Sequence, residues 1–280
     1  LEIYRIKKLN ENTKISGLIG NPVEHSFSPI IHNAGFEKFG INAVYLKFSV
    51  DKLREFVSYF RKLNVMGFSV TIPHKIEIMK YLDYIDIKAK QIGAVNTIVV
   101  KNNKWYGCNT DCDGAIKALK EKTELKNKKV VILGAGGSAR AIIYALREEN
   151  TKITILSRKK EKAKDLGAYF NCEYGIMSDL THRKKIDYDI LINTTPVGMH
   201  PNINESPIPQ GLIKENSVVF DIVFNPFKTK LLKQAEENGC IAIPGIEMLI
   251  YGAMMQFKLW TGKDVPEDEI RMSLRNHCGF

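Results

Sequence analysis

Short apolar runs, often β-branched, alternate along the whole chain with segments whose apolar residues recur at helical spacing. Each run is followed by a polar loop or a helix, which is typical of buried strands. The expected strands are residues 16–20, 43–50, 67–73, 130–133, 152–158, 188–193 and 217–223, with a hairpin over 97–108 that turns at Asn102-Asn103. Such continuous alternation, with neither tandem repeats nor low-complexity linkers, predicts an α/β fold.

Several segments between these strands are expected to be helical. Ser28 as N-cap and Pro29 in the first turn predict a helix that runs to Gly40. A helix is also expected after Pro73, after the glycine-rich turn near residue 135, and over 245–262 and 266–277. Another helix should bury one apolar stripe, formed by Leu53, Phe56, Val57, Phe60 and Leu63.

Two α/β domains are expected, because a basic stretch from Lys117 to Lys129 separates two strand–helix series. The predicted boundaries are 1–112 for the first domain, 113–245 for the second, and 246–280 for closing helices that return to the first domain.

The charge balance narrows the choice of partners. The 280 residues hold 41 Lys and Arg against 31 Asp and Glu, a formal net charge of +10. This surplus points to an anionic partner, which can be nucleic acid, a membrane surface or a phosphorylated small molecule. Nucleic acid is disfavoured because the lysines are dispersed and no aromatic platform accompanies them.

Membrane insertion, secretion and metal binding are not expected. Apolar runs stay well short of the roughly 18 residues of a membrane span, and the first 20 residues carry scattered charges unlike a signal peptide. The five cysteines are dispersed, and Cys108 and Cys112 lack a second pair or a nearby His at zinc spacing. We therefore expect reduced thiols, no metal site and a cytoplasmic location.

A glycine-rich turn follows the strand that ends at Leu133. Gly134, Gly136 and Ala139 fit the pattern G-x-G-x-x-G/A between a strand and an amphipathic helix. Backbone amides at the start of that helix are suited to a pyrophosphate. The expected dinucleotide contacts in this turn are Gly134, Ala135, Gly136, Gly137 and Ser138.

The end of the next strand favours NADP over NAD. An NAD site places Asp or Glu about 20 residues further on, to bind the ribose 2′-hydroxyl. Here the chain reads Ser157, Arg158, Lys159, and the first acid comes only at Glu161. Cations at Arg158, Lys159 and Lys162 suit a 2′-phosphate instead.

Polar side chains follow the apolar strands of the first part. They are Ser26, Ser28, Thr71, Lys75, Asn96 and Asp111. Each has an ordinary explanation as a cap, a turn residue or a surface charge. Together they offer hydroxyl, amide, ammonium and carboxylate groups at strand ends, where open α/β sheets bind ligands, and they suit a small polyhydroxylated acid.

These motifs resemble one known family. SFSP, SVTIPHK, GAVNT, NTD, GAGGSARA, NTTPVGM and the closing ML…F…WTG stand in the order found in shikimate dehydrogenases, over essentially the whole chain. The resemblance implies an N-terminal substrate domain, a Rossmann-type NADP domain and C-terminal helices packed on the first domain. It implies NADPH-dependent, reversible reduction of 3-dehydroshikimate to shikimate on the route to chorismate and the aromatic amino acids.

The resemblance also assigns roles to residues. It implies that Ser26 and Ser28 bind the substrate carboxylate and that Lys75 and Asp111 form the catalytic pair. The ring hydroxyls and the reacting oxygen would be bound by Thr71, Lys75, Asn96 and Asp111. Further cofactor contacts are implied at Thr194, Thr195, Ile222, Phe224 and Gly245. The partner is then a small-molecule substrate, and the chain a monomer or homodimer.

Three positions depart from the family's pattern. Ser69 stands where Asn is usual, Phe224 where Tyr is usual, and Gly252 where a substrate-binding Gln is usual. Gln256, about one helical turn further on, is a candidate replacement. Two alternatives therefore stay open, a paralogue that uses quinate or NAD, and a weakly active regulatory homologue.

Overall fold

The computed structural model describes residues 9–178 and 187–278. The chain divides into two compact units, and the predicted two-domain α/β fold is confirmed. One unit combines the chain up to Thr110 with the chain from Ala253 onward, and the other is Asp111–Gly252. These divisions lie a few residues from the boundaries expected after residues 112 and 245.

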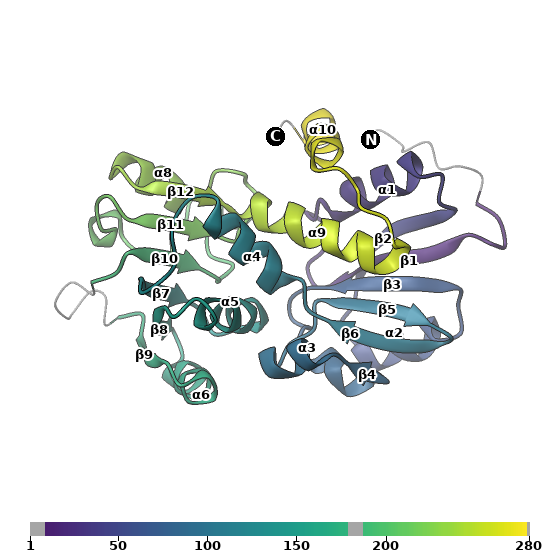
Figure 1. Cartoon of the computed structure of the whole chain (residues 1–280), viewed down its shortest axis with the longest axis horizontal. Coiled ribbons are helices and arrows are strands. Elements are labelled where there is room, and N and C mark those ends of the chain that lie inside the picture. The colour runs from purple at the N-terminus through teal and green to yellow at the C-terminus, as the bar shows by residue number, and fades with distance from the viewer. Residues whose placement is uncertain (1–8, 179–186, 279–280) are drawn as a thin grey trace. The chain divides into compact units, whose positions relative to one another are not determined.

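The first unit is built on a six-stranded mixed sheet with the order β2-β1-β3-β5-β6-β4 (Figure 1). Its strands are β1 Lys14–Gly20, β2 Ala43–Ser49, β3 Val65–Val70, β4 Tyr84–Ile85, β5 Thr97–Lys101 and β6 Lys104–Cys108. Strands β2 and β3 pair with β1 in parallel, whereas β5 is antiparallel to both β3 and β6. Every residue of β3 is buried, so this strand lies at the centre of the unit.

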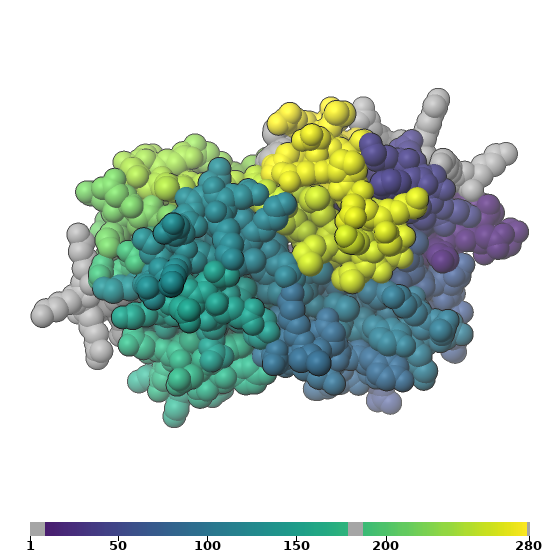
Figure 2. Space-filling view, in the orientation of Figure 1, coloured from purple at the N-terminus to yellow at the C-terminus, as the bar shows by residue number. Residues whose placement is uncertain are grey.

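The helices of this unit include the end of the chain. They are α1 Ser28–Lys38, α2 Leu53–Phe60, the 3₁₀ turn η1 Glu77–Tyr81, α3 Ile87–Ile92, the later part of α9 Gly245–Thr261, and α10 Glu267–Cys278. Helix α10 packs against α1, and the two surfaces adjoin in Figure 2. The Trp260 indole of α9 donates to the Ile98 carbonyl of β5 at 2.9 Å. The C-terminal helices thus return to the first unit, as predicted.

Aromatic rings form much of the core beside α2. Phe56 and Phe60 stack with centroids 4.1 Å apart, and both lie edge-on to Phe68 of β3. The stripe predicted for α2 is therefore correct for four of its five residues. Leu63 is 49% exposed because the helix ends at Phe60, before the stripe reaches it.

Two further local predictions were wrong. Phe27, not Ser28, is the N-cap of α1, and the Phe27 side chain makes no capping hydrogen bond. Ser28 is its first residue, and its backbone N–H donates to Ser26 Oγ. The segment after Pro73 forms only the five-residue turn η1, because backbone bonds around residues 71–75 delay the helical turn.

The hairpin between β5 and β6 turns where the sequence predicted. Asn102 and Asn103 have φ angles of 50° and 58°, the left-handed conformation that a two-residue type I′ turn requires. Among residues with a side chain, asparagine adopts this conformation more readily than most, because its short polar side chain can form hydrogen bonds with the nearby backbone.

The second unit is a six-stranded parallel sheet with the order β12-β11-β10-β7-β8-β9. Its strands are β7 Lys129–Leu133, β8 Lys152–Ser157, β9 Glu173–Ile176, β10 Ile190–Asn193, β11 Val218–Asp221 and β12 Ile241–Pro244. Its helices are α4 Asp111–Lys120, α5 Gly137–Arg147, α6 Lys160–Phe170, η2 Gln210–Leu212, α8 Lys230–Glu237 and the start of α9. This order, 3-2-1-4-5-6 within the unit, is that of Rossmann dinucleotide-binding domains, and it reverses between β7 and β10.

A buried carboxylate ties together the loops at the ends of β10 and β11. Asp221 is fully buried and accepts from Asn193 Nδ2 at 2.9 Å, Thr229 Oγ1 at 2.7 Å and the Val223 amide at 3.1 Å. Burial raises the pKa of Asp221 to about 6, while its three hydrogen bonds oppose the rise. The hydrogen bonds of Asp221 therefore fix the loops after β10 and β11, which carry several of the expected cofactor contacts.

Asp221 should give the folding free energy a distinctive pH dependence. Because the folded state holds this proton more tightly than the unfolded state, its stabilising contribution is full below about pH 4 and is lost as pH rises through about 6. Relative to Asp221→Asn, the wild type should lose on the order of 2–3 kcal/mol between pH 3.5 and 7. Urea unfolding of both proteins across this range measures the difference.

Asp187→Asn is the matched control. Lys129 and Lys214 lower the pKa of this exposed carboxyl to about 2, so its stabilising contribution is present at neutral pH and is lost on acidification. For each variant, the free energy of unfolding of the wild type minus that of the variant can be plotted against pH. The plot should fall with rising pH for Asp221→Asn and rise with rising pH for Asp187→Asn. A flat curve for Asp221→Asn would contradict the assignment.

The hairpin gives a second stability prediction. Asn103→Val forces a β-branched residue into the left-handed region and should lower the free energy of unfolding by about 1–2 kcal/mol. Asn103→Gly satisfies the turn without that strain and should stay within about 0.5 kcal/mol of wild type. Equal losses in the two variants, measured by urea unfolding, would show that the turn conformation does not matter.

Candidate active site

The first predicted site residues lie where α1 begins. Ser26 Oγ donates to Ser28 Oγ at 3.1 Å and accepts from the Ser28 amide at 3.2 Å. Ser26 is partly exposed and Ser28 is buried. The structure thus brings the two hydroxyls within hydrogen-bond distance of each other at the start of α1.

Lys75 stands in a turn that is fixed on both sides. The His74 amide donates to the Thr71 carbonyl at 2.9 Å, and the Val95 amide donates to the Lys75 carbonyl at 2.8 Å. The buried His74 ring is bonded to the Val50 carbonyl at 2.6 Å. The backbone under Thr71 and Lys75 is therefore rigid, and both side chains are partly exposed.

Asn96 is the centre of a buried polar cluster before β5. Its Oδ1 accepts from Thr97 Oγ1 at 2.7 Å and from the Thr110 amide at 2.8 Å, and its Nδ2 donates to Thr110 Oγ1 at 3.1 Å. These bonds fix the orientation of the Asn96 amide. Thr97 and Thr110 were not predicted as site residues, because a single threonine beside a strand has no distinctive sequence pattern.

Asp111 opens α4 in the second unit, and it is partly exposed. A carboxylate in the first turn is favoured by the amides at a helix N-terminus. It follows Thr110, the Asn96 partner of the first unit, directly in the sequence. Lys75 and Asp111 belong to different units, so their pairing stays a prediction.

The glycine turn has the conformation that dinucleotide binding needs. Gly134 has φ +113°, and a Cβ there would lie 2.5 Å from Thr194 Oγ1. Gly136 is the exposed N-cap residue of α5, and a Cβ at this position would meet open space. Ala139 is fully buried, as the close-packed third position of the motif requires. The residues present therefore fit a pyrophosphate at the N-terminus of α5.

The cations expected near a 2′-phosphate are exposed. Ser157 ends β8 and is buried, whereas Arg158, Lys159 and Lys162 lie on the surface at the start of α6. Among the described residues, none forms a hydrogen bond or ion pair with the Arg158 side chain. A guanidinium in this position is available to an anionic ligand.

The remaining expected cofactor contacts lie at the ends of β10 and β11. Thr194 Oγ1 donates to the Leu133 carbonyl at 2.7 Å, and Thr195 Oγ1 donates to Asn193 Oδ1 at 2.7 Å. Ile222 and Phe224 are partly exposed on the loop after β11. A Cβ on Gly245 would lie 2.4 Å from the Ile222 carbonyl group, so only glycine allows α9 to begin this close to that loop.

The Gln256 side chain is engaged inside the first unit. It is buried, and its amide is bonded to Ser69, Thr97 and the Asn96 carbonyl. Its expected role as a replacement for the Gln that the family has at the position of Gly252 stays a prediction. Gly252 lies close to Gly114 of α4. A Cβ added to Gly114 would be only 3.1 Å from the Gly252 nitrogen.

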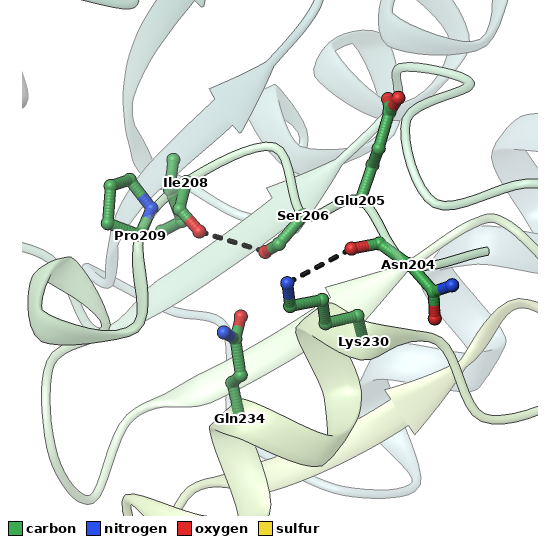
Figure 3. Close-up of a pocket in the computed structure, with 7 residues that line it drawn as sticks. All are labelled: Asn204, Glu205, Ser206, Ile208, Pro209, Lys230 and Gln234. Carbon is green, nitrogen blue, oxygen red and sulfur yellow. Dashed lines mark hydrogen bonds between the residues drawn. The ribbon is translucent and has the colours of Figure 1, made fainter. Parts of the chain in front are cut away.

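A surface pocket of the second unit includes none of the predicted site residues in its lining (Figure 3). In it, Lys230 Nζ donates to the Asn204 carbonyl at 3.0 Å, and Ser206 Oγ donates to the Ile208 carbonyl at 2.8 Å. The lining residues are Asn204, Glu205, Ser206, Ile208, Pro209, Lys230 and Gln234. These side chains brace the loop before η2 and give no indication of chemistry.

Two other kinds of site are absent from the part of the chain that the structure describes. Residues 9–178 and 187–278 contain no group of three His, Cys, Asp or Glu side chains placed to hold a metal ion. Within the same ranges, no helix has the length and apolar character to cross a membrane.

Known proteins match the chain along its length. Residues 18–98 match the shikimate dehydrogenase substrate binding domain, residues 117–231 match shikimate/quinate 5-dehydrogenase, and residues 245–275 match the shikimate 5′-dehydrogenase C-terminal domain. A shikimate dehydrogenase (NADP⁺) of Methanococcus maripaludis is 46% identical over 268 residues, which cover 91% of this chain and 93% of the relative.

Solved structures agree with these matches. A shikimate dehydrogenase crystallised with NADP⁺ superposes with a TM-score of 0.87 at 42% identity, covering 96% of both chains. The Thermus thermophilus shikimate 5-dehydrogenase, crystallised with NADP(H) and shikimate, gives a TM-score of 0.84 at 29% identity, covering 94% of this chain and 99% of that one. The chain belongs to the shikimate dehydrogenase family.

Proposed function

We propose that this chain catalyses the reversible, NADP-dependent reduction of 3-dehydroshikimate to shikimate, a step on the route to chorismate. The observation that carries the proposal is the family match across both units and the closing helices, at 46% identity to an NADP⁺-dependent relative. The enzyme is then an oxidoreductase that acts on a CH–OH group.

The second unit is the proposed cofactor domain. Gly134 to Ser138 and the N-terminus of α5 would hold the pyrophosphate, and Arg158, with Lys159 and Lys162, would hold the 2′-phosphate. Ser157 would lie beside the adenosine. The loops with Thr194, Thr195, Ile222, Phe224 and Gly245 would lie along the rest of the cofactor, anchored by Asn193 and Asp221.

The first unit is the proposed substrate domain. Ser26 and Ser28 would donate to the carboxylate, and Thr71 and Asn96 would bind ring hydroxyls. The fixed orientation of the Asn96 amide lowers the entropy lost when a hydroxyl binds, which favours tight recognition.

Lys75 and Asp111 are the proposed catalytic pair. Reduction adds a hydride at the carbonyl carbon and a proton at its oxygen, and bound NADPH supplies the hydride. The Lys75 ammonium would donate the proton as negative charge develops on that oxygen, and the Asp111 carboxylate would orient the ammonium. In the reverse direction Lys75 takes the proton back.

Further expectations go with this proposal. The partner would be a small acid substrate, with no role for nucleic acid or membranes, and the enzyme would work in the cytoplasm. A monomer or a homodimer is compatible with a site formed within one chain.

Lys75→Ala should remove most of the turnover. General acid catalysis by a positioned side chain contributes about 10²–10⁴-fold, so kcat for shikimate oxidation with NADP should fall at least about 100-fold. The Kd for NADP, measured by fluorescence titration, should change by less than about twofold because Lys75 lies outside the proposed cofactor domain.

Lys80→Ala is the matched control, since Lys80 is exposed on η1 five residues away and should leave the rate unchanged. A Lys75→Ala enzyme with near-normal kcat would overturn the role of Lys75. A wild-type protein without turnover of shikimate and NADP would overturn the proposed function itself.

Arg158→Ala should affect NADP and NAD differently. Hydrogen bonds between charged groups are worth about 1.5–3 kcal/mol, so the KM for NADP should rise about 10-fold or more, while the KM for NAD, which lacks the 2′-phosphate, should stay within about twofold. Lys152→Ala, at the opposite end of β8, is the matched exposed control. Equal losses with both cofactors would place the 2′-phosphate elsewhere.

A further inference from the structure

A buried chain of hydrogen bonds runs through the first unit from Tyr45 to Asn96. The Tyr45 hydroxyl is its first donor, and the Tyr45 side chain is almost fully buried. Burial raises the pKa of this hydroxyl. Tyr45 therefore keeps its proton and can act as a donor within the chain.

The middle of this chain consists of two residues that are far apart in the sequence. The Tyr45 hydroxyl donates to Ser69 Oγ at 2.7 Å, and Ser69 Oγ donates to Gln256 Oε1 at 2.8 Å. Ser69 lies on β3 and Gln256 on α9, so the bond joins the central strand to the returning helix. Both side chains are buried.

The other end of the chain reaches Asn96 twice. Gln256 Nε2 donates to Thr97 Oγ1 at 3.0 Å and to the Asn96 carbonyl at 3.3 Å. Thr97 Oγ1 then donates to Asn96 Oδ1 at 2.7 Å. Gln256 thus holds the backbone of Asn96 directly and its side-chain amide through Thr97.

All the donors point the same way, from Tyr45 through Ser69 and Gln256 to Asn96. Hydrogen bonds in such a series polarise one another, and in a buried environment the loss of one link leaves costly unpaired groups. His32 packs beside the series, with its ring stacked on Tyr45 at 4.5 Å. Burial lowers the pKa of His32 to about 3, so this neighbour stays neutral and adds no charge.

We propose that Gln256 is a positioning residue for the substrate site, which fixes Asn96 and links it to Ser69 and Tyr45. The proposal rests on the substrate role proposed above for Asn96. The Gln256 amide is already bonded to Ser69, Thr97 and Asn96, so Gln256 acts through Asn96 and not by contact with the substrate.

Gln256→Met tests the positioning role, because it keeps the length of the side chain and removes its polar atoms. The KM for shikimate should rise about tenfold, whereas the KM for NADP should stay within about twofold, since the chain of bonds lies wholly in the first unit. Met255→Ala changes the neighbouring, 37% exposed residue of the same helix and is the matched control. A purely structural loss would reduce the amount of active enzyme without separating the two KM values.

Ser69→Ala combined with Gln256→Met tests the coupling between these two residues. If Ser69 and Gln256 act on Asn96 through one chain of bonds, the double variant should raise the KM for shikimate about tenfold, no more than Gln256→Met alone, and not by the product of the single effects, about thirtyfold. Effects that multiply would overturn the coupling. An unchanged KM for shikimate in Gln256→Met would overturn the positioning role.

Ser69→Ala keeps the test decisive if Gln256→Met does not fold. This variant breaks the central link and leaves the bonds from Gln256 to Thr97 and Asn96, so the KM for shikimate should rise about threefold with an unchanged KM for NADP. An unaltered KM in a folded Ser69→Ala protein would count against the chain. Turnover by the wild type is measured first, because its absence would reject the proposed function, whereas an active wild type with unresponsive variants would reject this inference alone.

Discussion

Polar groups buried at the ends of the strands must find partners inside the protein, and both units are organised around this constraint. A buried amide or carboxylate without a hydrogen bond costs more than most single contacts contribute. In the first unit Asn96 is satisfied by Thr97 and Thr110, and in the second Asp221 is satisfied by Asn193, Thr229 and Val223. The same bonds that remove the cost also fix the loops that carry the chemistry.

The two clusters meet the constraint differently. The first uses neutral hydroxyls and amides, which can be arranged in one direction without any charge. The second keeps an ionisable carboxyl, whose burial raises its pKa, and surrounds it with three donors. A neutral cluster suits a site that must distinguish hydroxyl positions on a substrate, whereas a carboxylate with three donors makes a stronger anchor for loops around a cofactor.

The surplus of positive charge has only a small part in this arrangement. Of the net charge of +10, the proposal uses Lys75 at the reacting oxygen and Arg158, Lys159 and Lys162 at a phosphate. Other cations form surface ion pairs, such as Lys129 and Lys214 with Asp187. Such exposed pairs contribute little to stability, so the charge is more relevant to attracting anionic ligands than to holding the fold.

Much of the fold was predictable because it depends on local patterns. Apolar runs identified the central strands, and Asn102-Asn103 identified the hairpin, since each signal lies within a few residues. The short strands β4 and β9 lacked such runs, and the apolar run of β12 is only four residues long. The basic stretch beginning at Lys117 hid the helix α4. The position of Ser28 inside α1, and not at its cap, depends on contacts that the sequence does not contain.

The candidate site was predictable as a set of residue types and not as a network. Ser26, Ser28, Thr71, Lys75, Asn96 and Asp111 could be chosen because each follows an apolar run, and the turn from Gly134 because its motif has a strand before it and a helix after it. Their supporting partners could not, since the bond between Ser69 and Gln256 joins residues 187 positions apart.

The hydrogen-bond network explains the departure from the family's pattern at Ser69, and helix packing explains the departure at Gly252. Considered singly, each looks like the loss of a polar group, and together they suggested a weakened or altered substrate site. In the structure the Ser69 hydroxyl accepts a hydrogen bond from the Tyr45 hydroxyl and donates one to Gln256. The polar side chain that is missing at Gly252 of α9 is thus present one turn later, at Gln256, in a buried location. Gly252, meanwhile, allows α9 to approach Gly114 of α4 closely. Both departures therefore have a structural explanation, a buried series of hydrogen bonds at Ser69 and a close helix contact at Gly252.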